Sequence, residues 1–299
     1  MSLLDRSLAA AVAAHRTCEL STLAKDGTPV TWPVSARLHP DGTFTLTTSL
    51  GFPQKAFNIR RDGRVALLFS DPTGSGLDAP PQVLVHGTAT CPDEITTTPG
   101  DLADYWAMLF ERQPSSRAYL KPPVRPVVDW YYMRLVITVT PTAVTSRPRL
   151  PAVDGRPAAT PLLGAAALAD FPSAVLGVRD GDGAPTLFRV RPVPGETGFA
   201  VDVPEDAEIR PGRASLLGHR HDEQLAGAKF VLVRGELTGG PGGWSLVPSR
   251  EVRPAGSAWS TIRRTRRSTR DYLAKRGLGR PRVDWAGFTA VADSVRRHP

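Results

Sequence analysis

Cysteine and long apolar runs are scarce in this sequence, and each shortage excludes a class of protein. Of 299 residues only Cys18 and Cys91 are cysteine, which is too few for a disulfide framework or a cysteine-based metal cluster. No apolar stretch approaches the roughly 20 residues that a helix needs to cross a bilayer. The short Ala-rich run after Arg6 is too weak for a signal peptide. We therefore expect a cytoplasmic protein in a reducing compartment, with no membrane partner.

Proline and glycine, by contrast, are abundant, with 29 and 27 residues. They favour many short strands and turns over long helices. The chain is 41% hydrophobic and 22% charged, as in globular proteins, and is long enough for two domains. Its net charge of +8 is concentrated near the C-terminus, because residues 263–276 contain seven basic residues and only one acidic residue, Asp271.

A candidate anion site lies in residues 43–69, which read TFTLTTSLGFPQKAFNIRRDGRVALLF. Phe44–Thr48 is predicted to be a strand that leads into the hydroxyl run Thr47–Ser49, and Lys55 follows after a short turn. Hydroxyls and free backbone N–H groups can donate to an anion, and an ammonium group adds charge. Spacing alone leaves two interpretations open, namely a phosphate cradle and a surface loop with one solvated lysine.

The pattern of the first half returns in the second half of the chain. SAVLGVRDGDGAPTLFRVRPVPGETGFAVDV, at 173–203, mirrors ELSTLAKDGTPVTWPVSARLHPDGTFTLTTS, at 19–49. Two shorter segments also repeat: RASLL at 213–217 after RVALL at 64–68, and VLVRG at 231–235 after VLVHG at 83–87. This two-fold internal repeat predicts two similar β domains joined by a Pro-rich linker.

Hydrophobic periodicity and turn signals place the secondary structure. Strands are predicted at 19–24, 30–38, 44–48, 65–69, 82–90 and 131–140. Helices are predicted at 2–15, 101–112, 257–276 and 285–295, and a further short helix is predicted to end with residues 58–62. Ser2 is the expected cap of the first helix. The basic helix at 257–276 has an expected apolar stripe of Trp259, Ile262 and Tyr272 or Leu273, so we expect it to pack on the barrels.

These ordered motifs resemble the FMN-binding split barrel of the pyridoxamine 5'-phosphate oxidase superfamily over residues 15–145. In that family a strand ending in Thr or Ser leads through Gly to Lys-Ala, and an Arg-Val-x-Leu-Leu strand follows. The matching pieces here are TTS, Gly51, Lys55-Ala56 and RVALL, and QVLVHG at 82–87 is similar to the family's Gln-Val-x-Val-x-Gly strand. The resemblance implies a mainly β fold with peripheral helices, built as two tandem split β-barrels that form an intramolecular pseudo-dimer.

The resemblance also implies a division of the chain. The expected parts are a cofactor-competent split barrel at 1–147, a linker at 148–162, a second split barrel with a degenerate cofactor site at 163–254, and a basic helical extension at 255–299. The second site is expected to be inactive because the stretch between Val203 and Arg213 has no hydroxyl row and no Lys-Ala, while Phe230 replaces Gln82. Three carboxylates there would repel a phosphate: Glu205, Asp206 and Glu208.

The cofactor implied by the resemblance is FMN, with a 5-deazaflavin as the alternative. The expected cofactor-binding residues are Trp32, Pro33, Val34, Thr47, Thr48, Ser49, Lys55 and Gln82. In the second half, Arg189 and Arg191 are candidates for reaching across to this site. The implied function is an FMN-dependent oxidoreductase that acts on a small organic substrate. The alternatives are a deazaflavin-dependent reductase and a non-catalytic flavin- or haem-binding protein.

Other features narrow the function without naming a substrate. No nucleophilic or metal constellation emerges, and His219-Arg220-His221 lacks further ligands at metal-binding spacing. Pro53-Gln54-Lys55 replaces the Ser-Arg-Lys run of true pyridoxamine phosphate oxidases, and their C-terminal Trp…Arg-x-His segment is missing, which argues against vitamin B6 as the substrate. The basic helix has no aromatics interleaved for reading bases, which argues against a nucleic-acid partner. The Arg-, Ala-, Gly- and Pro-rich composition indicates a bacterial, high-GC source.

Overall fold

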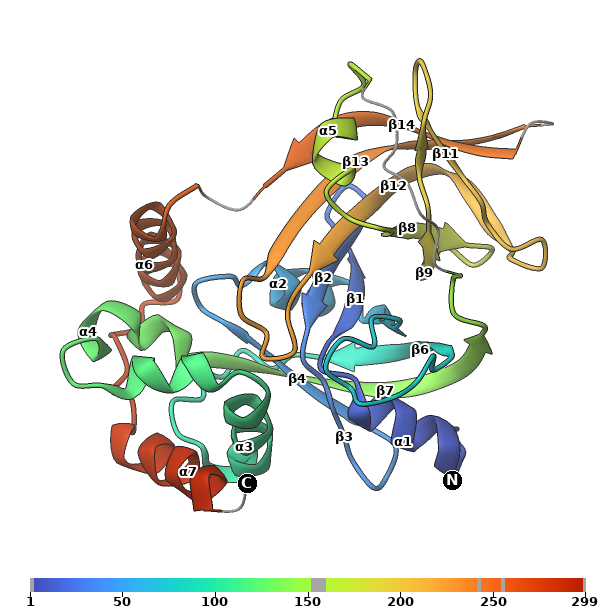
Figure 1. Ribbon diagram of the computed structural model, residues 1–299. Coiled ribbons are helices and arrows are strands. Elements are labelled where there is room, and N and C mark those ends of the chain that lie inside the picture. The colour runs from blue at the N-terminus through green and yellow to red at the C-terminus, as the bar shows by residue number, and fades with distance from the viewer. Residues whose placement is uncertain (1–2, 152–159, 241–242, 254–255, 298–299) are drawn as a thin grey trace.

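The computed structural model describes residues 3–151, 160–240, 243–253 and 256–297, and its main features are two seven-stranded antiparallel sheets (Figure 1). The first sheet has the strand order β2-β1-β5-β6-β7-β4-β3. The second, taken from its other edge, has the equivalent order β9-β8-β12-β13-β14-β11-β10. Each sheet curls around its own apolar core. The predicted mainly β fold of two tandem split barrels with peripheral helices is therefore confirmed.

The strands of the first sheet are β1 (Cys18–Leu23), β2 (Pro29–Val34), β3 (Arg37–Leu38), β4 (Phe44–Ser49), β5 (Arg64–Phe69), β6 (Gln82–Thr90) and β7 (Arg134–Arg147). Those of the second are β8 (Ala174–Asp180), β9 (Pro185–Val190), β10 (Val193–Pro194), β11 (Phe199–Val201), β12 (Ile209–Arg220), β13 (Lys229–Gly240) and β14 (Gly243–Val252). The helices are α1 (Arg6–Ala14), α2 (Gln54–Arg61), α3 (Ala103–Arg112), α4 (Arg125–Val128), α5 (Ala165–Leu168), α6 (Ala258–Ala274) and α7 (Trp285–Arg297), with 3-10 turns η1 (Gly100–Leu102), η2 (Pro114–Leu120) and η3 (Asp129–Tyr131).

Three predicted elements differ from the observed ones by more than two residues at one end. The first helix begins at Arg6, because the Asp5 carboxylate accepts a hydrogen bond from the Leu8 N–H and caps it. Ser2, the predicted cap, lies outside the described residues. The predicted strand 30–38 is divided into β2 and β3, because β2 pairs with β1 at one edge of the sheet and β3 pairs with β4 at the other.

The last strand of the first half is the third difference. It begins at Arg134 instead of Tyr131 and continues to Arg147, into the start of the predicted linker. It is extended because β7 pairs with β6 from Thr138 to Arg147, which lies opposite Gln82, with a bulge after His86. This long strand reaches from the helices at one end of the first barrel to the edge of the second barrel (Figure 1).

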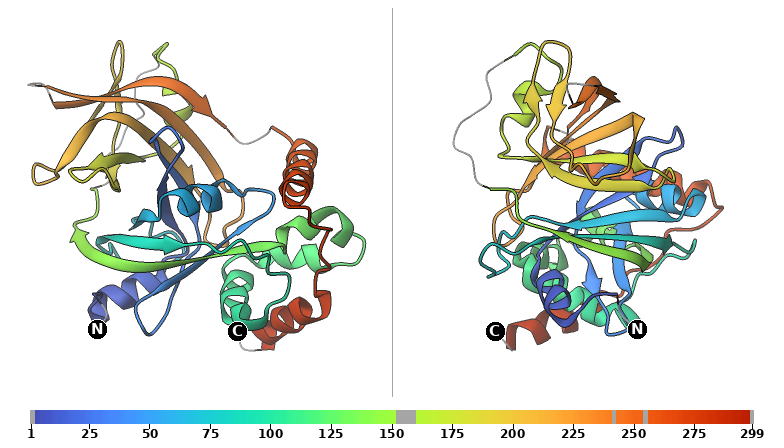
Figure 2. Two further views of the ribbon diagram at one scale, coloured as in Figure 1. Left: turned by 180° about the vertical axis from the view of Figure 1, so that it is seen from behind. Right: turned by 90° about the vertical axis from the view of Figure 1, so that its right-hand side faces the viewer.

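The two halves share an apolar interface to which each contributes four buried side chains. They are Val30, Ala66, Leu68 and Leu84 from the first half, and Val175, Leu187, Leu217 and Leu232 from the second. The halves also approach closely at Gly177, where a Cβ would lie 2.7 Å from the side-chain Oγ1 atom of Thr31. The halves therefore pack as the two members of a pseudo-dimer, seen from two sides in Figure 2.

The C-terminal helices pack on the first half of the chain, as the views in Figures 1 and 2 agree. Tyr272 and Leu273 of α6 are buried in the core of the first barrel, which confirms that end of the predicted stripe. Trp259 is 72% exposed, so its predicted burial is wrong, and Thr265 and Thr269 are the fully buried residues in the middle of the helix. Helix α7 lies beside α3.

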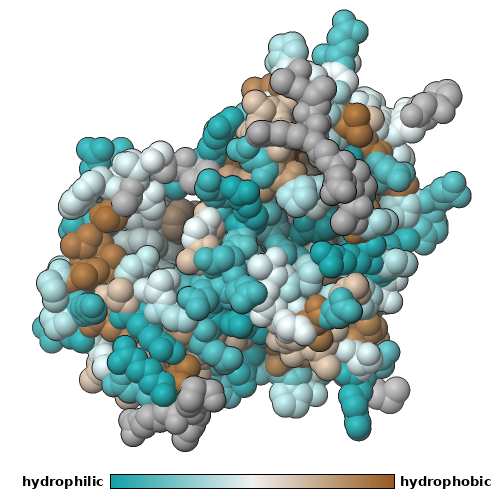
Figure 3. Space-filling view, in the orientation of Figure 1, coloured by the Kyte–Doolittle hydropathy of each residue, from teal (hydrophilic) through white to brown (hydrophobic). Residues whose placement is uncertain are grey.

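None of the helices in the described ranges combines the length and apolar character needed to cross a membrane. On the face shown in Figure 3 hydrophilic side chains predominate, and apolar ones occur in separate patches.

Candidate functional site

Lys55 and Arg134 are two cations held close together at one end of the first barrel. Lys55 lies in the first turn of α2, and Arg134 begins β7, where it pairs with Ser49 of β4. The Lys55 ammonium lies 5.2 Å from the centroid of the Trp32 ring, and the Arg134 guanidinium lies 4.2 Å from that of Tyr131. Within the described residues neither cation forms an ion pair with a carboxylate, so both contact aromatic faces instead.

The electrostatics of this site favour an anion. Burial, with a second contribution from the charge of Arg134, lowers the pKa of Lys55 to about 8. The Nε of Arg134 is buried and has no hydrogen-bond partner among the described residues. A buried donor without a partner is costly, and an anion that accepted from it would remove that cost. We therefore take Ser49, Lys55 and Arg134 as the centre of the site and call them the cation site.

The three hydroxyls at the end of β4 differ in their availability. Thr47 Oγ1 donates to the hydroxyl of Tyr105 at 3.4 Å, and Thr48 Oγ1 donates to the carbonyl of Phe52 at 2.7 Å. The hydroxyl of Ser49 has no hydrogen-bond partner in the described parts of the chain. Ser49 is thus the hydroxyl that remains available for a ligand, next to Arg134.

The predicted residues of β2 have different surroundings. Trp32 lies under the Lys55 ammonium and packs at the edge of the interface between the halves. Pro33 pairs with Glu19 in the β1–β2 hairpin, and Val34 packs against the core of the first barrel. The structure therefore brings Trp32 to the cation site.

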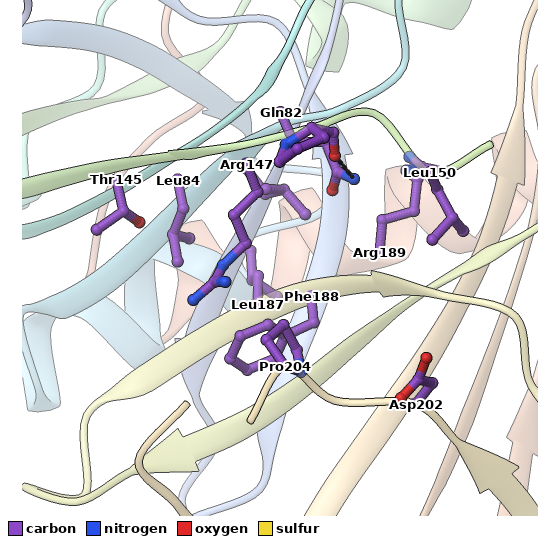
Figure 4. A pocket seen from close by; sticks show the side chains of 12 residues that line it. Gln82, Leu84, Thr145, Arg147, Leu150, Leu187, Phe188, Arg189, Asp202 and Pro204 are labelled. Carbon is purple, nitrogen blue, oxygen red and sulfur yellow. Dashed lines mark hydrogen bonds between the residues drawn. The ribbon is translucent and has the colours of Figure 1, made fainter. Parts of the chain in front are cut away.

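Gln82 lies at the other end of β7 from the cation site. It pairs with Arg147, the last residue of the strand, whereas Arg134 is the first. At about 3.3 Å per residue these ends are up to roughly 40 Å apart. Gln82 lines a different pocket together with Arg189, between the two halves (Figure 4). The structure thus separates Gln82 from the other predicted cofactor residues.

The pseudo-dimer explains this separation. In the first sheet, Leu20 of β1 pairs with Trp32 of β2 on one side and with Leu67 of β5 on the other. In the second sheet, Leu176 of β8 pairs in the same way with Phe188 of β9 and Leu216 of β12. Phe188 is therefore the counterpart of Trp32. The pocket that Gln82 lines contains Phe188, so it lies at the position equivalent to that of Trp32, and Gln82 enters it from the first barrel. We call it the Gln82 pocket.

Arg189 also crosses between the halves, but its partner is a buried carboxylate. Its Nη2 donates to Glu19 Oε1 at 2.6 Å and its Nε donates to Ser70 Oγ at 2.8 Å. His219 Nε2 lies 2.7 Å from the same Glu19 oxygen. Burial alone would raise the pKa of Glu19, but Arg189, His219 and Ser70 together hold it below its usual value. Arg189 therefore joins the barrels and does not reach the cation site.

Arg191 and His221 are the last residues that the sequence analysis singled out. Arg191 is partly buried and forms no hydrogen bond or ion pair with any described residue. His221, which the sequence places near His219, has its Nε2 atom 2.9 Å from the Thr17 hydroxyl and 3.7 Å from Asp71 Oδ2. No group of three or more metal-ligating side chains occurs in the described ranges. The sequence prediction missed Arg134, because only the pairing of β4 with β7 brings it to Ser49.

Comparison with known proteins identifies one family that the chain resembles. Residues 4–144 match the pyridoxamine 5'-phosphate oxidase family. The first half of the chain is therefore similar to this family, which is consistent with a protein of the pyridoxamine 5'-phosphate oxidase-like kind. No curated protein matches the chain.

Solved structures resemble about half of the chain. A conserved hypothetical protein from Mycobacterium tuberculosis is 26% identical, with 52% of this chain and 93% of that one covered and a TM-score of 0.35. An F420 reductase is 22% identical, with coverages of 48% and 98% and a TM-score of 0.34. An FAD-binding protein from Mesorhizobium loti is 19% identical, with coverages of 46% and 87% and a TM-score of 0.31.

Proposed function

We propose that this chain is an FMN-dependent oxidoreductase that binds the FMN phosphate at the cation site and acts on a small organic substrate. The observation that carries the proposal is the pair of cations, Lys55 and Arg134, which has no carboxylate partner among the described residues. A phosphate dianion would accept charge-assisted hydrogen bonds from both and from the Ser49 hydroxyl. FMN supplies redox chemistry when bound.

The residues around the cation site fit this role. Trp32 offers an aromatic surface beside Lys55, at the edge of the interface between the halves, where a ring can lie against apolar side chains. Thr47 and Thr48 hold the end of β4 in place through Tyr105 and Phe52. In this proposal residues 1–147 form the cofactor-competent barrel, 148–162 the linker, 163–254 the degenerate barrel, and 255–299 the basic extension. The chain acts as a monomeric pseudo-dimer.

The first test is the absorbance spectrum of the purified protein, which distinguishes FMN, a deazaflavin, haem and no cofactor. If the protein is isolated without cofactor, FMN is added and its fluorescence is followed. Saturable binding supports the proposal, and the absence of binding contradicts it. Turnover of the bound flavin with NAD(P)H or dioxygen then separates an oxidoreductase from a non-catalytic flavin- or haem-binding protein.

A groove on α6 favours a 5-deazaflavin as the second candidate cofactor. Five arginines line this groove of about 430 Å³: Arg263, Arg266, Arg267, Arg270 and Arg280. The opposite face of α6 touches the loop before α2, where Ser268 donates to the Leu50 carbonyl. The acidic glutamate tail of a deazaflavin held at the cation site would find complementary charge on the same helix. Affinity for the deazaflavin, compared with that for FMN, should then fall more steeply as salt is added.

A further inference from the structure

Helix α6 carries a row of arginines on the face that it turns away from the first barrel. Thr265, Thr269 and Tyr272 are buried on the barrel side of the helix. The outer side has four exposed arginines at the spacing i, i+3, i+4 and i+7, which places them on one face: Arg263, Arg266, Arg267 and Arg270. Together with Arg280 they line a groove of about 430 Å³. The packing of α6 therefore leaves a row of positive charge facing solvent.

The charge of this row has little to balance it. Arg280 is held by the Asp129 carboxylate, to which its Nε donates at 2.7 Å. In the described ranges the four arginines of α6 form a single ion pair, between Arg270 and Asp271, and it is 3.8 Å long. Like charges four residues apart, such as Arg263 and Arg267, destabilise a helix. A polyanion bound along the row would remove this repulsion.

Trp259 continues the row toward the N-terminus of the helix. It lies four residues before Arg263 and therefore on the same face, and its side chain is 72% exposed. The sequence predicted that this ring packs on the barrels, which left the arginines without an aromatic neighbour. An exposed indole is a flat surface on which a base can stack, while arginines beside it bind phosphates. From Trp259 to Arg270 the row is about 16 Å long, enough for a few nucleotides of an extended strand.

The direction of the apolar side chains argues against a membrane surface as the partner. Helices that lie in a membrane interface bury a broad apolar face among the lipids. In α6, Tyr272 and Leu273 are buried in the core of the first barrel, and Trp259 is the one large hydrophobic residue exposed among the described side chains of the helix. A nucleic-acid duplex is also less suitable than a single strand, because its stacked bases leave no free face for Trp259.

We propose that the outer face of α6 binds single-stranded nucleic acid, with the arginines on the phosphates and Trp259 stacked on a base. This function goes beyond flavin binding, since no residue of the cation site takes part in it. A deazaflavin tail and a nucleic-acid strand would compete for the same arginines, whereas FMN at the cation site would not.

The test uses fluorescein-labelled oligothymidylate and oligouridylate of about 12 nucleotides, and the anisotropy of the label reports binding to the full chain without cofactor. Wild type should bind these probes, with an affinity that falls steeply as salt is added. The combined variant Arg263→Gln, Arg266→Gln and Arg267→Gln should weaken binding at least about tenfold. It should also reduce the slope of log Kd against log salt concentration by roughly 2, because each phosphate contact of a single strand contributes about 0.7.

The matched control removes the same charge from the second sheet. Arg210, Arg220 and Arg250 are exposed arginines of β12 and β14. Changing all three to Gln should alter the affinity less than about twofold, because salt screens charges that lie far from the bound strand.

Trp259→Ala tests the stacking separately from the charge. It should weaken binding of the single strands about fivefold or more and leave the salt slope unchanged, while Trp259→Phe should keep most of the affinity. Binding of a duplex of the same length should be weaker in wild type and unaffected by Trp259→Ala.

The outcomes that would overturn the proposal are specific. They are no binding of either oligonucleotide, equal effects of the two triple variants, and single-strand binding that Trp259→Ala leaves unchanged, which would mean a general attraction to anions. Binding to phosphatidylserine vesicles in place of oligonucleotides would also overturn it. Circular dichroism shows whether the triple variant folds, and Trp259→Ala, at an exposed position, decides if it does not. Because the probes contain no flavin, a chain that binds them and fails to bind FMN contradicts only the proposed function.

Discussion

Arg189 of the second barrel and Glu19 of the first form an ion pair of 2.6 Å across the interface, with the Glu19 side chain fully buried. Ser70 and His219 donate to the same carboxylate. A second ion pair between the halves, Arg213 with Asp26 at 3.0 Å, is about half exposed on both sides. The two pairs have similar geometry and differ in burial, so they can be compared directly.

Glu19→Gln should destabilise the protein by about 3–5 kcal/mol, because it leaves Arg189 buried without a counter-charge. Asp26→Asn is the matched control, and an exposed pair of this kind contributes about 0–1 kcal/mol. Urea denaturation measures both. The pKa of folded Glu19 lies below its usual value, so the stability it contributes is present above about pH 4.5 and is lost as pH falls through the folded pKa. The difference in unfolding free energy between wild type and Glu19→Gln should therefore decrease as the pH falls through the same range. Equal destabilisation by Glu19→Gln and Asp26→Asn would contradict this account.

Lys55→Ala should weaken FMN binding roughly ten- to a hundredfold, because a charge-assisted contact to phosphate contributes about 1.5–3 kcal/mol. Lys25 lies in the exposed turn of the β1–β2 hairpin, so Lys25→Ala removes the same charge from the chain and should leave the affinity unchanged. Fluorescence titration gives both affinities. Equal affinity of the Lys55 variant and wild type would remove Lys55 from the site.

FMN affinity should depend on pH through Lys55. Its pKa of about 8 in the free protein means that the ammonium form predominates below pH 8 and is progressively lost above it. Only the charged form attracts the phosphate, so affinity should be nearly constant from about pH 6.5 to 7.5 and fall above 8, by up to about tenfold per pH unit. Lys55→Ala should lack this decline. A wild-type affinity that stays flat to pH 9.5, or the same decline in the variant, would contradict the assignment.

Gly51→Ala should loosen α6 from the first barrel. A Cβ at Gly51 would lie 2.8 Å from the ring of Trp130 and 2.9 Å from the Cβ of Thr265, so either neighbour must move. We expect a loss of about 1–3 kcal/mol in unfolding free energy, together with faster tryptic cleavage in the arginine-rich helix. Gly279→Ala, where a Cβ would meet nothing within 4 Å, is the control and should change neither measurement.

The close contact at Gly51 also explains what the sequence could predict and what it could not. Strand β6 was predicted with its observed bounds, because alternating residues and flanking turn residues are local signals. The stripe of α6 was predicted from helical spacing to include Trp259. The helix instead buries Thr265 where it touches Gly51, since only a small side chain fits there.

Long-range pairing is the other part that the sequence could not provide. Arg134 reaches the cation site only because β4 pairs with β7 in a register that places Arg134 directly across from Ser49. Gln82 was predicted beside Lys55 because both match motifs of one family. In the structure it serves the opposite face of the pseudo-dimer, next to Phe188. A linear motif gives the residues of a site in a dimeric fold but does not say which of the two equivalent sites each residue enters.

One FMN per chain is the expected stoichiometry, since only one of the two equivalent positions has a cation site. The first half has α2 with Lys55, while residues 202–208 of the second half form a turn. At that turn Asp206 pairs with Arg147, and unpaired carboxylates nearby would repel a phosphate. The measurement is the FMN released by heat per mole of chain, starting from saturated protein. The Lys55→Ala variant, loaded at an FMN concentration that just saturates wild type, should release much less than one FMN per chain. A ratio near two for wild type would show that the second half also holds a phosphate, and that the Arg147–Asp206 pair opens to admit it.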